Sequence, residues 1–221
     1  MSFLTRIIDV TGPIYTGMWQ YGPPFPEIKI EPLPEIPWVK HKVYSDIFAG
    51  VSSQTGTYIE TNAHYFKDEK KLSDIPLERL FMVDAAVLNL KPKGPKEPIQ
   101  REEIIALKPE IREGDAILFG TRWGQRWREA GFVKDSPYLT YDTVMWFLDQ
   151  KPSILGGDIP TFDNPNNPQG FWDKFFRSGA LLLAPLVSLE KVLKPRVKLV
   201  ALPLNVEGTC SAPCRTIVVE E

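Results

Sequence analysis

The sequence predicts a single mixed-sheet α/β domain, and two observations support that class. The chain has 221 residues, 43% of them hydrophobic and 24% charged, which suffices for one domain with a sizeable core. Patterns typical of short strands fill the first half, whereas strands and helices alternate in the second half. Because no stretch has the composition of a linker, we expect residues 1–221 to form one domain.

Short runs of β-forming residues predict the elements of the first half. Residues 6–10 form the first strand, which a long loop rich in aromatic residues follows. Residues 38–49 alternate partly between apolar and polar types, as a strand with one face on a core would. Further strands are expected at 56–61 and 82–90.

Turn and cap signals divide the second half into helices and buried strands. Thr140 can cap a helix in which Val144 and Phe147 share a face. A later helix can end at Gly179. The predicted helices span residues 101–107, 142–150 and 170–178, and the predicted strands span 115–121, 153–158, 180–186, 198–204 and 215–221.

Charge and hydropathy exclude several classes of function. The 26 basic residues nearly balance the 28 acidic ones, so nothing favours nucleic-acid binding through bulk charge. No apolar run approaches the roughly 18 residues of a membrane-spanning helix, and the start of the chain lacks a signal-peptide core. Glycine-rich phosphate motifs and a Gly-x-Ser-x-Gly elbow are also missing. We therefore expect a cytoplasmic protein that binds neither nucleic acid nor a membrane.

Two cysteines, Cys210 and Cys214, lie four residues apart in a segment that contains a proline. They are too few for a disulfide framework. Three alternatives stay open: two thiols in a turn, a local disulfide, or half of a metal site. A metal site would need further ligands, and the chain has two histidines, His41 and His64.

The densest group of polar residues lies between positions 54 and 64. In an extended chain, the period of two places Gln54, Tyr58 and Glu60 on one face, with His64 just beyond the strand. A carboxylate beside an imidazole supports general acid and base catalysis, because the negative charge raises the pKa of the histidine. The alternative is a surface strand on which His64 is merely hydrogen-bonded.

This segment resembles the signature of the cyclase superfamily that includes bacterial kynurenine formamidase and isatin hydrolase. That signature is His-x-Gly-Thr-His-x-Asp-x-Pro-x-His, and Gly56, Thr57 and His64 match it. The positions that differ are Gln54 and Tyr58, which replace the first two histidines, Glu60, which replaces the aspartate, and Asn62, which replaces the proline.

Further stretches extend the resemblance over about residues 6–219. IIDVTGPIYTGM is similar to the family's start, and GDAILFGTRWGQRW to its Gly-Asp, apolar run, Thr-x-Trp segment. GGDIPTFDNP, FFRSGALLLAPL and VALPLNVEGTCSAPCR follow in the family's order. The resemblance implies a domain of the family's swivelling β/β/α type.

The resemblance also implies a site for one or two divalent ions, usually zinc or manganese. The family's ligands are the first two histidines, the aspartate, and a later His and Glu, whose positions fall at Trp172 and Ala184. Of the five ligand positions, only Glu60 keeps a good ligand. We therefore expect no metal cofactor. If one zinc or manganese ion is bound after all, Glu60 and His64 would hold it.

His64 matches the family's proton donor and acceptor, which supports an enzyme. Without a metal, another group must stabilise a developing oxyanion, and Arg122 and Gln125 are candidates. Trp19 and Trp123 could wall a pocket for a flat ligand, together with Gln54 and Tyr58. The alternatives are exposed polar side chains on a loop, and aromatic side chains in the core or at a subunit interface.

Three functions follow from these observations. The first is an enzyme that acts on a small cyclic or ring-forming amide, lactone or carbonyl substrate, with His64 and Glu60 as the acid–base pair. The second is a non-catalytic member of the cyclase fold that binds a ligand or serves in assembly. The third is a metal-dependent amide hydrolase with one divalent ion. In each case the partner is a small molecule, and the resemblance implies a homo-oligomer.

Overall fold

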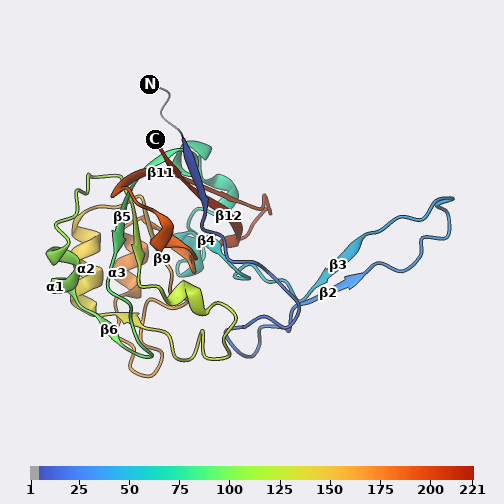
Figure 1. The fold of residues 1–221 in the computed structure, drawn as a ribbon, viewed down its shortest axis with the longest axis horizontal. Coiled ribbons are helices and arrows are strands. Elements are labelled where there is room, and N and C mark those ends of the chain that lie inside the picture. Colours follow the sequence, from blue (N-terminus) through green and yellow to red (C-terminus); the bar gives the residue numbers. More distant parts are fainter. Residues whose placement is uncertain (1–4) are drawn as a thin grey trace.

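A mixed sheet of eight strands forms the centre of the computed structural model, which describes residues 5–221 (Figure 1). Its strands are β1 (Arg6–Asp9), β4 (Tyr58–Glu60), β5 (Val83–Asn89), β7 (Ala116–Gly120), β9 (Ile154–Gly157), β10 (Leu181–Ala184), β11 (Arg196–Pro203) and β12 (Ser211–Glu220). Their order is β1-β12-β11-β5-β7-β9-β10-β4, and β4 also pairs with β12. That last pairing closes seven strands into a barrel-like ring, with β1 added outside it.

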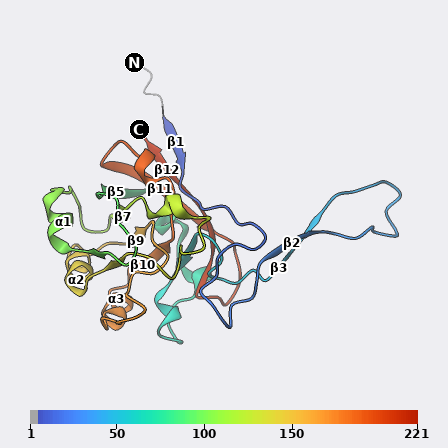
Figure 2. The same cartoon turned by 60° about the horizontal axis from the view of Figure 1, so that its bottom comes forward.

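The parallel part of the sheet explains where the helices lie. The pairs β5–β7, β7–β9 and β9–β10 are parallel, and parallel neighbours need a crossover connection. The three crossovers contain helices α1 (Arg101–Ala106), α2 (Tyr141–Asp149) and α3 (Trp172–Arg177). Figures 1 and 2 show all three helices on the same side of the ring, so one face of the sheet is covered.

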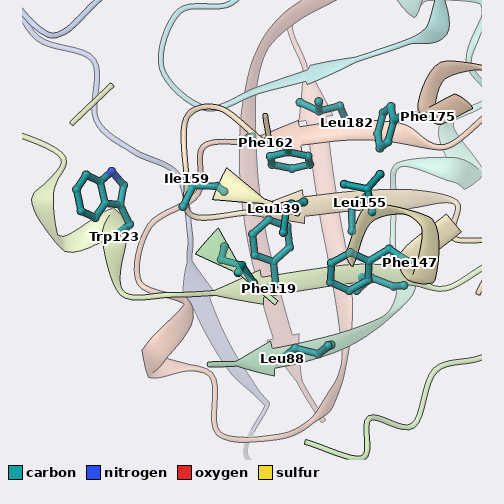
Figure 3. Packing of buried hydrophobic residues seen from close by; sticks show 14 of the residues in the cluster. Leu88, Phe119, Trp123, Leu139, Phe147, Leu155, Ile159, Phe162, Phe175 and Leu182 are labelled. Atoms are coloured by element: carbon teal, nitrogen blue, oxygen red, sulfur yellow. The ribbon is translucent and has the colours of Figure 1, made fainter. Parts of the chain in front are cut away.

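Alternation along the strands divides the hydrophobic core in two. In β7, Ile117 and Phe119 pack toward the helices, whereas Ala116 and Leu118 belong to the cluster on the other face. Figure 3 shows the first cluster, in which the ring of Phe119 stacks on that of Phe147 at 5.8 Å between centroids. Because both faces of these strands are buried, they are continuous apolar runs in the sequence.

The predicted elements largely match the observed ones. The strands expected at 6–10, 56–61, 82–90, 115–121, 153–158, 180–186, 198–204 and 215–221 are confirmed, as are the three helices. Thr140 caps α2, since its side chain accepts a hydrogen bond from the backbone N–H of Thr143. Gly179 follows α3 with a φ of +78°, the left-handed conformation that ends many helices. Within residues 5–221, no helix has the length and apolar character needed to cross a membrane.

The strand predicted at residues 38–49 is wrong in extent and in surroundings. Only Asp46–Ala49 form a strand, β3, which pairs with β2 (Lys29–Pro32) in an antiparallel hairpin. This arm, residues 29–49, extends away from the ring (Figures 1 and 2). The apolar side chains of this alternating segment therefore face no core of their own chain. Trp38 and Tyr44 are 83% and 85% exposed. A further small sheet joins β6 (Pro98–Ile99) and β8 (Tyr138–Leu139).

Candidate active site

A cavity of about 340 Å³ lies beside β4, β10 and α3. Its walls are mainly aromatic, and the aromatic lining residues other than Tyr58 are Tyr21, Phe25, Tyr65, Phe162, Trp172 and Phe176. Its polar lining residues are Gln54, Tyr58, Glu60, His64 and Thr161. All four residues singled out in the 54–64 segment thus meet at one concave site, as ligand pockets do.

The register between β4 and β10 sets which side chains reach this cavity. Glu60 pairs with Leu182, and Tyr58 pairs with Ala184, so the four side chains lie on one face of the sheet. The residue between them, Ile59, belongs to the core on the opposite face. The expectation that Tyr58 and Glu60 share a face is therefore confirmed.

Gln54 reaches the site through a turn rather than through the predicted extended strand. The strand begins at Tyr58, and Gly56 in the preceding turn has a φ of +69°, which favours glycine. The turn brings the amide Nε2 of Gln54 to 2.7 Å from Oε2 of Glu60, to which it donates a hydrogen bond. The amide therefore occupies one oxygen of the carboxyl group.

His64 ends a short 3-10 turn, Asn62–His64, that follows β4. The side chain of Thr61 caps this turn by accepting a hydrogen bond from the backbone N–H of Ala63. Nδ1 of His64 lies 3.3 Å from Oε2 of Glu60, and the two side chains are 41% and 3% exposed. His64 thus stands at the open side of the cavity, whereas Glu60 lies inside it.

Burial sets the protonation states of this pair. It raises the pKa of Glu60 to about 8, against the opposing effect of the Gln54 amide. Burial also lowers the pKa of His64 below its ordinary value. The expected rise in the histidine pKa is therefore wrong, because Glu60 is itself neutral over the range in which His64 titrates. Near pH 7 the contact joins a carboxylic acid to a neutral imidazole and is not an ion pair.

Two tyrosines close the far side of the polar group. The hydroxyl of Tyr21 donates to the carbonyl oxygen of Pro160 at 3.0 Å, and it lies 3.2 Å from the hydroxyl of Tyr58. Because Tyr21 uses its proton on Pro160, the proton between the two hydroxyls belongs to Tyr58. Burial raises the pKa of both tyrosines, so both remain protonated.

The positions that the resemblance assigned to the later metal ligands do lie at this site. Trp172, on α3, and Ala184, on β10, both line the cavity. Each contributes an apolar surface in place of a ligand atom, so the cavity wall is closed where the family's pattern has a His and a Glu. Sequence reasoning did not assign either residue to the wall of a pocket.

Four predicted site residues do not line the cavity. The segment that contains Arg122 and Gln125 folds into a short 3-10 turn, on which both side chains are exposed. Trp123 is fully buried in the core, where its indole N–H donates to the carbonyl of Phe132 at 2.9 Å. Trp19 packs with its ring centroid 5.0 Å from that of Phe132.

The lining residues that sequence reasoning missed include Tyr65, Pro160, Thr161, Phe162, Phe176 and Leu182. Tyr65 directly follows His64, and that adjacency was the one signal available for it. The others come from the loop after β9, from α3 and from β10, and their convergence depends on strand order. Thr161 is notable because its hydroxyl is buried and has no hydrogen-bond partner among the described residues.

The donor atoms at this site do not fit a divalent metal. Gln54 offers its amide N–H₂ to Glu60, Tyr58 remains protonated, and Trp172 and Ala184 have no ligand atom. Residues 5–221 contain no group of three or more His, Cys, Asp or Glu side chains arranged to hold a metal ion.

Comparisons with known proteins agree with the fold. The family model described as "Putative cyclase" matches residues 8–164. The kynurenine formamidase of Salinibacter ruber is 27% identical over 177 residues, which cover 76% of each chain. That of Bacillus cereus is 24% identical over 220 residues, which cover 96% of each chain.

Solved structures resemble the whole domain. An isatin hydrolase bound to the product analogue thioisatinate superposes with a TM-score of 0.81, 22% identity, and coverage of 98% of this chain and 92% of that one. A structure described as a predicted metal-dependent hydrolase from Bacillus stearothermophilus gives a TM-score of 0.79 at 23% identity, and covers 99% of this chain and 100% of that one. At these identities the likeness establishes the fold.

The closed mixed sheet defines a cyclase-type α/β domain. The chain belongs to the cyclase family, and the resemblance inferred from its motifs is confirmed. The single α/β domain is confirmed as well.

Proposed function

We propose that the protein is a cyclase-family enzyme that acts on a small cyclic or ring-forming amide, lactone or carbonyl compound through Glu60 and His64. One observation carries the proposal: an acid–base pair meets an unpartnered hydroxyl in a cavity with aromatic walls. The kynurenine formamidases and isatin hydrolases to which the chain is similar bear names of enzymes that act on small molecules.

The protonation states assign a role to each member of the pair. Below a pH of about 8, Glu60 carries a proton and can donate a hydrogen bond to a carbonyl oxygen as negative charge develops there. The imidazole of His64 is neutral and can take a proton from an attacking water or hydroxyl group. Such a pair supplies a donor and a base without a metal ion.

The cavity selects its ligand by shape and charge. Its lining residues include six aromatic side chains besides Tyr58, and no Lys or Arg occurs among the lining residues of the described chain. A flat uncharged compound can therefore fill the cavity without leaving a carboxylate unpaired. Thr161 also lines the cavity, and its buried hydroxyl has no hydrogen-bond partner among the described residues, so it is the group that we propose to bond a polar atom of that compound. Glu60 takes the role of oxyanion stabiliser that the sequence suggested for Arg122 and Gln125, which lie outside the cavity.

The test is a screen of aryl formamides, cyclic amides and lactones against the wild type and His64→Ala. General acid–base catalysis contributes about 100- to 10,000-fold, so His64→Ala should lose that much of kcat/KM. The fold should survive, because the His64 side chain is 41% exposed, and thermal melts check this. His41→Ala is the matched control, since His41 lies on the exposed arm. Turnover that His64→Ala leaves unchanged would exclude the proposed mechanism.

The replaced ligand positions, Trp172 and Ala184 among them, favour a second candidate function, a binding protein without catalysis. In that case no compound of the screen would be turned over, yet one of them would raise the melting temperature of the wild type. The two candidates are thus separated by turnover, whereas both predict a ligand in the same cavity.

A further inference from the structure

Cys210 lies next to His64, the partly exposed member of the acid–base pair, and just outside the residues that line the cavity. Its Sγ is 3.8 Å from Nδ1 of His64, and the residue is partly exposed. The backbone holds it in place, because the carbonyl oxygen of Cys210 accepts a hydrogen bond from the N–H of Thr61 at 2.8 Å. The next residue, Ser211, pairs with Glu60 in the sheet. A thiol, an imidazole and a carboxyl group are therefore fixed together by the β4–β12 pairing.

The second cysteine differs in every respect that matters for reactivity. Cys214 is 4% exposed, and burial raises the pKa of its thiol to about 12. Its sulfur accepts a hydrogen bond from the hydroxyl of Thr216 at 3.4 Å. Neither cysteine forms a disulfide within residues 5–221, so the local-disulfide alternative is not realised in this structure. Cys214 is thus an internal control for Cys210.

The surroundings of Cys210 suit a nucleophile. Reactive cysteines are partly exposed and lie beside a base such as histidine, which removes the thiol proton. The nearby carboxyl group of Glu60 is neutral below a pH of about 8 and so does not repel a developing thiolate. Its Oε2, 3.3 Å from Nδ1, can accept a hydrogen bond from the protonated imidazole. A ligand is also indicated independently of this cluster, because Thr161 lines the cavity and its buried hydroxyl has no hydrogen-bond partner within residues 5–221.

We propose that Cys210 is a nucleophile for acyl transfer at this site, with His64 as its base. The inference rests on the proposed function and extends it from acid–base to covalent catalysis. The substrate class is then an acyl compound, an amide or ester, whose apolar part occupies the cavity and whose carbonyl lies at its open side.

The steps balance with the acyl substrate and one water molecule as the reactants. The sulfur of Cys210 attacks the carbonyl carbon as its proton passes to Nδ1 of His64, and a C–S bond forms. The bond to the amine or alcohol breaks, and this leaving group takes the proton from His64. Water, deprotonated by His64, then attacks the thioester, so that a carboxylic acid leaves and the thiol of Cys210 is restored.

The experiment uses 4-nitrophenyl acetate, which reports acylation whether or not the natural substrate is known. We expect a burst of nitrophenolate equal to the enzyme concentration, and one acetyl group on Cys210 by mass spectrometry of its peptide. Cys214→Ala should keep the burst, whereas Cys210→Ala should abolish it. His64→Ala should slow acetylation of Cys210 about tenfold or more, because only a few per cent of an unassisted thiol is ionised near pH 7. Thermal melts of each variant confirm folding.

Two results would overturn the inference. One is acetylation of Cys210 at the same rate in the wild type and in His64→Ala. The other is turnover of an amide or lactone that Cys210→Ala leaves unchanged, which would leave the acid–base function intact and remove only its covalent form. A rapid burst at Cys210 without turnover of any amide or lactone in the screen would support the activated thiol and contradict the acid–base proposal for those substrates.

Discussion

Burial decides the protonation of the two residues on which the proposed reaction depends. Glu60 is 2% exposed, and the amide of Gln54 compensates only partly for the water it has lost. A carboxyl group kept neutral near pH 7 can act as a hydrogen-bond donor, which an exposed glutamate cannot do. The same burial keeps His64 unprotonated. The function of each residue thus follows from its depth in the cavity.

At the residue scale, Glu60→Gln should change how stability depends on pH. The pKa of Glu60 is about 8 in the folded protein and ordinary in the unfolded chain, so the folded state holds the extra proton between these values. Between these two pKa values, the free energy of unfolding of the wild type therefore falls as pH rises. Glu60 contributes at most about 1.4 kcal/mol per pH unit to that fall. Glu60→Gln removes that loss, and urea unfolding at pH 5 and pH 8 measures it.

The matched control for this prediction is Glu207→Gln, which makes the same substitution at an exposed position. It should shift the unfolding free energy equally at both pH values. The interpretation fails if Glu60→Gln gains no stability over the wild type between pH 5 and pH 8.

At the scale of elements, the turn before β4 determines whether Gln54 can reach Glu60. Gly56 in this turn has a φ of +69°, and a Cβ there would lie 3.0 Å from Cγ1 of Ile14. Both the conformation and the contact therefore oppose any larger residue. The polar group at the site depends on this turn as much as on the strand that follows it.

Gly56→Ala should cost about 1–3 kcal/mol of stability and weaken the hydrogen bond from Gln54 to Glu60. We expect turnover or ligand binding to fall with it. The comparison is Gly114→Ala, since Gly114 also has a positive φ, +87°, but a Cβ there meets no atom within 4 Å. Urea unfolding should show a loss in both variants, whereas binding should suffer only in Gly56→Ala. An equal effect of the two on binding would show that the turn does not position Gln54.

At the scale of the whole molecule, the site is assembled from β4, β10, α3 and several loops, and whether it can hold a metal ion depends on all of them. We predict that the protein purified without chelator holds no stoichiometric zinc or manganese. The reason is the donor set, because Gln54, Tyr58, Trp172 and Ala184, which line the cavity, stand where the family resemblance places metal ligands. Elemental analysis by mass spectrometry measures this, and one or two tightly bound ions per chain would contradict it.

The arm, residues 29–49, is the other feature of the whole molecule that bears on a prediction. It carries large apolar side chains that its own chain does not cover, among them Trp38, Tyr44 and Phe48, which is 69% exposed. The homo-oligomer implied by the family resemblance would bury such an arm against a second copy of the chain. We expect the double variant Trp38→Ser/Tyr44→Ser to form a smaller assembly than the wild type in light scattering.

Leu193→Ser is the matched control for the arm, because Leu193 is 77% exposed but lies outside residues 29–49. It should leave the assembly unchanged. A wild type that is monomeric at high concentration, or an assembly that tolerates the double variant, would show that the arm does not mediate oligomerisation.

The sequence by itself determined the class of fold, most of the strands and helices, and the family. Apolar runs, caps and turns are local signals, and Thr140, Gly179 and the buried strand at 115–121 were predictable because each depends on neighbouring residues. The 54–64 segment was predictable as a candidate site because its polar residues are also close together in the sequence. Its motif placed Gln54, Tyr58, Glu60 and His64 together within a few residues.

Only the tertiary structure decided what surrounds that segment. Strand order brought Ala184 opposite Tyr58, and it carried Trp123 into the core instead of the cavity. Sequence alternation could not distinguish the exposed arm from a strand with a buried face, because the pattern does not say whether a core is present. The direction of the His64 pKa was also beyond the sequence. Charge pairing and desolvation oppose each other, and burial, which depends on the whole fold, determines which of them prevails.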